Sequence, residues 1–165
     1  AFIAQLPETS LLAGWPSTPE EWPQRELTIN DVPYLTARKV LLTQEIHLPF
    51  HQAYVRELRS RMAALMAAYF ASDPRALTNL RDRFGVTHLL VDLRHYREPF
   101  PTYFHPFAKD VGFAIKAMRD GSEVVRQLAV AGVFSHAHQA VIDLSRIEDL
   151  PTDLLPIRSS SGVLQ

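Results

Sequence analysis

The segment VTHLLVDL at 86–93 constrains the fold of this chain more than any other stretch of its sequence. Successive residues of a strand point to opposite faces, so a strand that is largely apolar on both faces must be covered on both. Strands of this kind are typical of parallel sheets flanked by helices. Segment 86–93 therefore predicts a central strand in an α/β fold.

A long helical pattern precedes this strand. From Pro49, apolar residues recur at steps of three to four, which is the spacing of one helix face. We expect the helix to begin at Pro49, because proline suits the first helical turn. The face formed by Tyr54, Leu58, Leu65 and Tyr69 is predicted to be buried against the sheet.

A second helix is marked at both of its ends. Asp73 is the expected N-cap, Pro74 the first helical residue, and Gly85 the residue that closes the helix. Two further helices are expected, one at 106–118 and a shorter one between Asp120 and Gly132.

Further strands are predicted at 10–14 and 38–46, and 133–144 has the pattern of a β-hairpin. Together these elements predict a single three-layer α/β domain with a small, mostly parallel sheet, helices on both faces and a C-terminal β-hairpin at one edge. The domain is expected to span 10–150. Residues 1–9 are interpreted as an exit linker and 151–165 as a C-terminal tail.

Composition excludes several classes of protein and site. The 165 residues carry a formal net charge of −1 without blocks of like charge, which argues against nucleic-acid binding. The absence of cysteine excludes disulfides, thiolate metal sites and a cysteine nucleophile. Residue 1 is Ala, with neither an initiator Met nor a signal-type apolar stretch, and we interpret the chain as a piece of a longer protein or the product of N-terminal processing.

Motifs for phosphate or acyl chemistry are missing. The sequence contains no G-x-G-x-x-G, Walker A or G-x-S-x-G motif, and we expect no cofactor. His47 and His51 have the spacing of two metal ligands on one helix face, but the predicted helix start at Pro49 separates them, so we expect no metal site there. His51 is then expected to reach back toward a carbonyl or a neighbouring loop. His136 and His138 are a second close pair, without a nearby acidic cluster.

Several residues are candidates for binding a ligand, each with a structural alternative. Asp92 ends the 86–93 strand, where α/β folds often keep functional carboxylates; alternatively it caps the following turn or pairs with Arg94 or Arg38. Arg38 could bind an anion, or partner a helix C-terminus or a carboxylate. Trp15 could contact a sugar or lipid edge, or pin its proline-rich segment to the core.

Four segments resemble, in order, the C-terminal soluble domain of uncharacterised bacterial multi-spanning membrane proteins. These proteins are similar to glycosyltransferases of the GT-C type, such as dolichyl-phosphate-mannose mannosyltransferases. The segments are LLAGWP, DVPYLTARKVLLTQEIHLPFHQAYV, FGVTHLLVDLRHY and AVIDLSRI, and the likeness covers most of residues 8–147. The positions that match the pattern are Gly14, Arg38, Glu45, Pro49, His51 and Asp92.

The resemblance implies that catalysis lies elsewhere in the parent protein. The catalytic acidic residues of GT-C enzymes lie in a loop between early membrane helices, and nothing in this chain matches that loop. The implied function is a non-catalytic extracytoplasmic domain that faces the periplasm or cell exterior and positions an acceptor, holds a partner or braces the membrane part. The residues AFIAQLPETS would then be the end of the last membrane helix or its exit linker.

Two alternatives remain open from the sequence. One is a free-standing small α/β enzyme acting through Asp92, His51 or the His136 and His138 pair. The other is a binding module for a sugar or a polyprenyl phosphate, with Arg38 and Trp15 in its cleft. The candidate ligand-binding residues are Trp15, Arg38, Glu45, His51 and Asp92.

Overall fold

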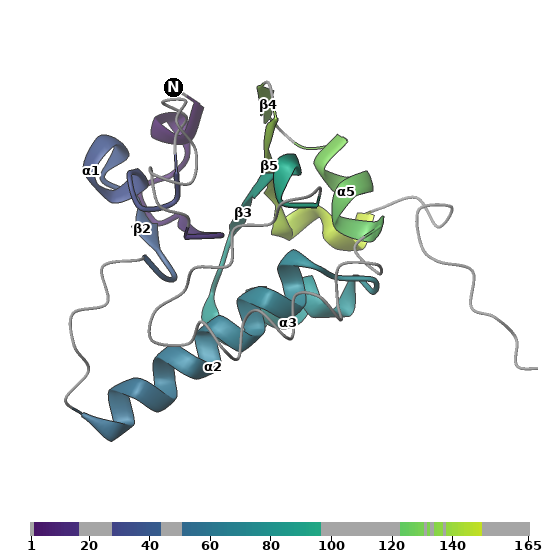
Figure 1. Cartoon of the computed structure of the whole chain (residues 1–165). Coiled ribbons are helices and arrows are strands. Elements are labelled where there is room, and N and C mark those ends of the chain that lie inside the picture. The colour runs from purple at the N-terminus through teal and green to yellow at the C-terminus, as the bar shows by residue number, and fades with distance from the viewer. Residues whose placement is uncertain are drawn as a thin grey trace, which may run out of the picture.

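Five strands form one sheet in the computed structural model, which describes residues 2–16, 28–43, 51–96, 123–130, 132, 134–136 and 138–149 (Figure 1). The strand order is β2-β1-β3-β5-β4. The strands are β1 (Leu11–Gly14), β2 (Lys39–Val40), β3 (His88–Asp92), β4 (Phe134–His136) and β5 (Gln139–Asp143). The α-helices of the described residues are α1 (Val32–Thr36), α2 (Gln52–Tyr69), α3 (Arg75–Phe84) and α5 (Glu123–Val130), and the 3-10 helices are η1 (Phe2–Gln5), η2 (Leu93–Tyr96) and η4 (Leu144–Asp149).

Most strands of the sheet run in one direction. Strand β1 pairs parallel with β2 and with β3, whereas β5 pairs antiparallel with both β3 and β4. It follows that β2, β1, β3 and β4 share a direction and that β5 runs against them. The sequence-based prediction of an α/β fold with a mostly parallel sheet is confirmed at this level.

The two faces of the sheet are buried in two separate apolar clusters. On one face, Ala13, Leu89 and Ile142 pack with side chains of α2, α3 and α5. On the other face, alternate residues such as Leu12 and Leu90 pack with η1 and with the α1 region. All five residues of β3 are buried, as its apolar sequence predicts for a strand with cover on both sides.

Helix α2 begins three residues later than predicted. His51 is its N-cap with an extended backbone (φ −113°, ψ 119°), and the first helical residue is Gln52; Pro49 lies outside the described residues. The prediction that His51 belongs to the helix is therefore wrong. No side-chain capping bond from His51 is present, and its side chain is exposed.

The predicted apolar face of α2 is buried only in its later turns. Leu58, Leu65 and Tyr69 are buried as expected, but Tyr54 is 48% exposed, so its predicted burial is wrong. Residues 52–57 are mostly exposed, and Figure 1 shows the start of α2 extending away from the sheet. The periodicity continues there, but the described part of the fold places no layer against it. None of the helices in the described ranges combines the length and hydropathy needed to cross a bilayer.

The other predicted elements agree more closely where they are described. Helix α3 has Pro74 at its N-cap, one residue later than predicted, while the side chain of Asp73 accepts a bond from the backbone N–H of Arg75 at 2.8 Å. Gly85 ends the helix in the left-handed conformation (φ 71°), as predicted. Of the strand predicted at 38–46, only Lys39–Val40 pairs with a neighbouring strand, and residues 44–46 lie outside the described residues. The helix predicted at 106–118 also lies outside the described residues. Helix α5 lies within its predicted range.

Candidate functional site

The carboxyl ends of β1 and β3 meet at a switch in chain topology. Strand β1 has β2 on one side and β3 on the other. The connection from β1 to β2 contains α1, whose Val32 packs on one face of the sheet, while the connection from β2 to β3 contains α2 and α3, which pack on the opposite face. In open α/β sheets, ligands usually bind at such a point. Trp15 follows β1 here and Asp92 ends β3.

Asp92 is held by Arg94, two residues further along the chain. Its Oδ1 accepts hydrogen bonds from the backbone N–H of Arg94 at 2.9 Å and from Nε at 3.0 Å, and its Oδ2 accepts from Nη2 at 2.5 Å. The two side chains are 10% and 18% exposed. The structural alternative, in which Asp92 caps the following turn and pairs with Arg94, is confirmed.

The protonation of Asp92 is set by two opposing effects. Burial alone would raise the pKa of Asp92, but the hydrogen bonds and positive charge of Arg94 outweigh it and hold this pKa below its usual value. The carboxylate is therefore charged at neutral pH, and both of its oxygens are hydrogen-bonded to Arg94. Such a group is a poor proton acceptor for catalysis at neutral pH.

Tyr69, the last residue of α2, is buried and hydrogen-bonds to this end of β3. The hydroxyl of Tyr69 accepts a hydrogen bond from the backbone N–H of Asp92 at 2.9 Å and lies 2.7 Å from Nδ1 of His95. Burial raises the pKa of Tyr69 well above its usual value, so the hydroxyl keeps its proton. Tyr69 and Nδ1 of His95 share this hydrogen bond, and the tautomer of His95 decides which of the two donates.

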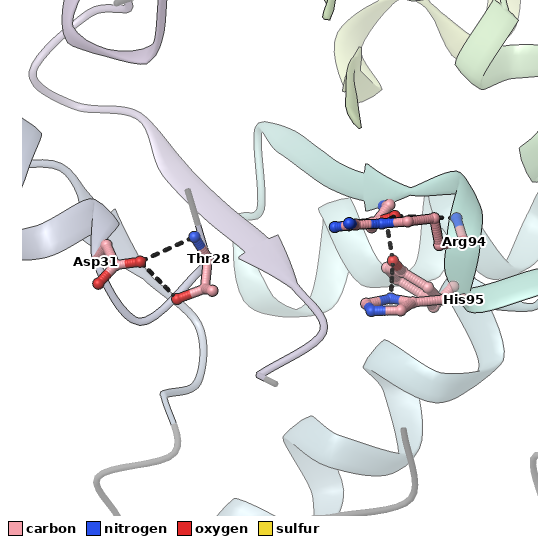
Figure 2. A network of polar contacts seen from close by, with 6 residues as sticks. Thr28, Asp31, Arg94 and His95 are labelled. Atoms are coloured by element: carbon pink, nitrogen blue, oxygen red, sulfur yellow. Dashed lines mark hydrogen bonds and ion pairs between the residues drawn. The ribbon is translucent and has the colours of Figure 1, made fainter. Parts of the chain in front are cut away.

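His95 stays neutral because of its surroundings. The His95 side chain is 2% exposed. Burial and the positive charge of Arg94 lower the pKa of His95 to about 4, although the negative charge of Asp92 acts to raise it. In Figure 2, His95 and Arg94 project from the segment that follows β3.

The same view shows a separate turn in which Oδ2 of Asp31 accepts hydrogen bonds from Thr28 N at 2.9 Å and from Thr28 Oγ1 at 2.8 Å.

Aromatic rings pack around Tyr69 and fill the space beside this network. Trp15 lies 5.8 Å from Tyr69 and 6.0 Å from Phe70, measured between ring centroids. Tyr96 stacks on Tyr69 at 5.6 Å, and its hydroxyl donates to the Tyr69 carbonyl at 2.6 Å. Trp15 is only 3% exposed, so it serves here as core packing, which is the structural alternative given for it, rather than as an open platform for a sugar.

The structure brings together only some of the predicted site residues. Trp15 and Asp92 lie around Tyr69, but Arg38 precedes β2 at the amino edge of the sheet, roughly 20 Å away by strand register. His51 and Tyr69 stand at opposite ends of α2, whose 18 residues span about 27 Å. Glu45 lies outside the described residues.

Arg38 binds backbone carbonyl groups. Its Nε and Nη2 donate to the carbonyl of Leu6 at 2.9 and 2.6 Å, Nη2 also donates to that of Ala4 at 3.0 Å, and Nη1 donates to that of Thr36 at 3.0 Å. The carbonyl of Ala4 lies within η1, that of Leu6 directly follows η1, and that of Thr36 ends α1. Arg38 therefore joins two short helices to the start of β2, in line with the structural alternative of partnering helix C-termini.

Comparisons of the chain with known protein families, with curated proteins and with solved structures find no match.

Two further features of the described residues bear on ligand binding. A groove of about 230 Å³ lies between the end of β2 and the first half of α2, and its lining consists of Val40, Leu41, Leu42, Thr43, Tyr54, Glu57, Leu58 and Arg61. Within the described ranges, no group of three or more His, Asp or Glu side chains is arranged to hold a metal ion. His136 and His138 are exposed, and His47 lies outside the described residues.

The sequence analysis did not predict that the Tyr69 hydroxyl and the His95 side chain belong to this hydrogen-bond network. Tyr69 was expected as an apolar member of a helix face, and nothing in that periodicity reveals that its hydroxyl bonds to the end of β3. The one available signal was the polar run that follows the strand, RHY at 94–96, since polar residues directly after a buried parallel strand often line its carboxyl end.

Proposed function

We propose that this chain is a non-catalytic, extracytoplasmic domain of a multi-spanning membrane protein similar to GT-C-type glycosyltransferases. In this role it positions an acceptor or a partner beside the membrane part of its own parent chain. We also infer the finer features of its fold from the sequence pattern: three layers, and a C-terminal β-hairpin formed by β4 and β5. The membrane parent and the location rest on the sequence resemblance described above.

The observation that carries the non-catalytic part is the pairing of Asp92 with Arg94. Asp92 stands where an α/β enzyme would place an acid or a base, yet it is buried, and both of its oxygens bond to Arg94. The neighbouring Tyr69 hydroxyl and His95 Nδ1 bond to each other. These groups hold the end of β3 against α2, which is the work of a scaffold.

Gly14, Arg38 and Asp92, three of the four described positions of the resemblance, have framework roles and support the same proposal, whereas the fourth, His51, is exposed. A Cβ atom on Gly14 would lie 3.0 Å from the Leu90 carbonyl oxygen and 3.3 Å from Ile29, so a side chain there would crowd the neighbouring strand. Arg38 fixes η1 to the sheet. Because these contacts fix the first described residues to the sheet, the orientation of the domain would be coupled to that of the membrane segment proposed to precede them.

The coding sequence upstream of the codon for Ala1 tests this proposal. We expect several apolar segments of roughly 20 residues, the last one ending close to residue 1. The isolated chain is expected to fold and to show no hydrolase or transferase turnover. An initiator codon directly before Ala1, or a cleavable signal peptide alone, would refute the membrane parent. Turnover that is lost on Asp92→Asn while folding is retained would refute the non-catalytic role.

A further inference from the structure

Positive charge is concentrated on the pair of helices α2 and α3. The segment 51–85, which contains both helices, has six arginines and only three carboxylates, whereas acidic residues slightly outnumber basic ones over the whole chain. The two helices contact each other and lie side by side in Figure 1. Each of the three carboxylates pairs with an arginine of the same segment: Glu57 with Arg61, Asp73 with Arg75 and Asp82 with Arg81. The remaining arginines, at 56, 59 and 83, are in excess over the acidic residues of this segment.

Two of the excess arginines approach each other at Ser60. In the last turn of α3, Nη2 of Arg83 donates to the Ser60 hydroxyl of α2 at 2.9 Å. Arg56 precedes Ser60 by four residues, so the two side chains lie one above the other on one side of α2. Both arginines are exposed, and Ser60 is half-buried. We call Arg56, Ser60 and Arg83 the α2–α3 basic site.

The basic site faces solvent and is held in place without a carboxylate. Arg56 and Ser60 are each two residues from buried Leu58, which places them on the opposite side of the helix. Within the described residues, neither Arg56 nor Arg83 forms an ion pair. The guanidinium of Arg83 instead lies 5.0 Å from the centroid of the Phe84 ring. Its bonds to uncharged groups restrict Arg83 while leaving its charge uncompensated, which is the state of a pre-organised anion site.

We propose that the α2–α3 basic site binds the phosphate group of a soluble anionic ligand. Guanidinium groups donate parallel pairs of hydrogen bonds to phosphate oxygens, and arginine clusters recognise phosphate for this reason. The Ser60 oxygen accepts from Arg83, so the Ser60 O–H can donate to the same phosphate. A site about one helical turn long fits a single phosphate or a diphosphate, whereas a nucleic-acid strand needs an extended row of cations. The inference is independent of the membrane parent proposed above.

The experiment titrates the whole 165-residue chain with inorganic pyrophosphate, while sodium chloride is varied to keep the ionic strength constant. The readouts are the NMR signals of the Ser60 amide and of the Nε–Hε groups of the arginines. Arg56→Gln and Arg83→Gln each remove one cation of the site. Arg75→Gln is the matched control, because Arg75 is an exposed arginine of α3 that pairs with Asp73. Far-UV circular dichroism verifies that each variant is folded.

We expect saturable shifts at Arg56, Ser60 and Arg83. Each site variant should weaken pyrophosphate binding about fivefold, which is the effect of losing one exposed charged contact. The control Arg75→Gln should bind like the wild type. Shifts that do not saturate, or that are equal at Arg75 and Arg83, would overturn the proposal, because pyrophosphate would then only screen the surface charge.

A second measurement distinguishes a soluble ligand from a lipid headgroup. The chain is sedimented with vesicles of phosphatidylcholine and phosphatidic acid in the same buffer, and we expect it to remain in the supernatant. Sedimentation with the vesicles that is lost on Arg83→Gln would overturn the assignment to a soluble ligand, because the basic site would then recognise phosphate on a lipid surface.

Discussion

Buried His95 should make the fold sensitive to acid over a defined pH range. Its pKa is about 4 in the folded chain, against 6.5 for an ordinary histidine. Between these values the unfolded chain binds a proton that the folded chain excludes, so this contribution to stability is complete above pH 6.5 and is lost as the pH falls toward 4. The difference of 2.5 pKa units corresponds to roughly 3 kcal/mol of unfolding free energy.

The matched variant is His95→Asn. An asparagine side chain can place its amide near the position of Nδ1, where it can donate a hydrogen bond to the Tyr69 hydroxyl or accept one from it, but it has no proton to gain in this range. Its starting stability is expected to be lower, since a buried ring is lost, so only the slope with pH is compared. Buried His88, whose pKa is also lowered by its burial, is common to both proteins, so its contribution cancels.

The effect is measured by urea unfolding of both proteins in steps of roughly half a pH unit from about pH 7.5 to about pH 4. This range is chosen because it includes both pKa values. The unfolding free energy of the wild type should fall more steeply below pH 6.5, and by pH 4 the excess loss should approach roughly 3 kcal/mol. Parallel curves for the two proteins would refute the assignment of a neutral, buried His95 bonded to Tyr69.

Three substitutions test the framework roles. Arg38→Ala should lower the unfolding free energy by about 2 kcal/mol, because the carbonyls of Leu6 and Ala4 lose a charged donor. Its amide hydrogen exchange should quicken in residues 2–6, and unchanged exchange there would count against the connection to η1. Gly14→Ala should cost about 1–3 kcal/mol, because its Cβ would lie 3.0 Å from the Leu90 carbonyl oxygen; an unchanged urea midpoint would show that β3 yields at no cost. Ala37→Gly should stabilise the fold by roughly 0.5–1 kcal/mol, because Ala37 is left-handed (φ 54°) at the end of α1, and a lower melting temperature would contradict this.

The sequence predicts much of the framework for clear physical reasons. The buried β3 is recognisable because a strand covered on both faces needs apolar residues in both registers. The end of α3 is recognisable because Gly85 takes a conformation that other residues avoid. The start of α2 is harder to locate, because Pro49 is compatible with the first turn of a helix but does not require it.

The candidate site depends on contacts that periodicity does not encode. Arg38 reaches the Leu6 carbonyl, 32 positions away in the sequence, and this pairing follows from strand order rather than from any local motif. The Tyr69 hydroxyl meets Asp92 for the same reason. The pairing of Asp92 with Arg94 could be anticipated because the two residues are near neighbours in the chain. Tyr54 illustrates the reverse case, since its position on the apolar face of α2 is regular but the described fold places nothing over it.

The location of the domain is the central claim, and labelling in intact cells tests it most directly. Ala63 is exposed on α2, and this chain contributes no cysteine of its own, so Ala63→Cys in the proposed full-length parent provides a single new thiol within the domain. A membrane-impermeant maleimide is added to intact spheroplasts and to lysed cells, with the unsubstituted parent as background. An extracytoplasmic domain predicts full labelling of the new thiol before lysis. Labelling that appears only after lysis would place the domain in the cytoplasm and contradict the account.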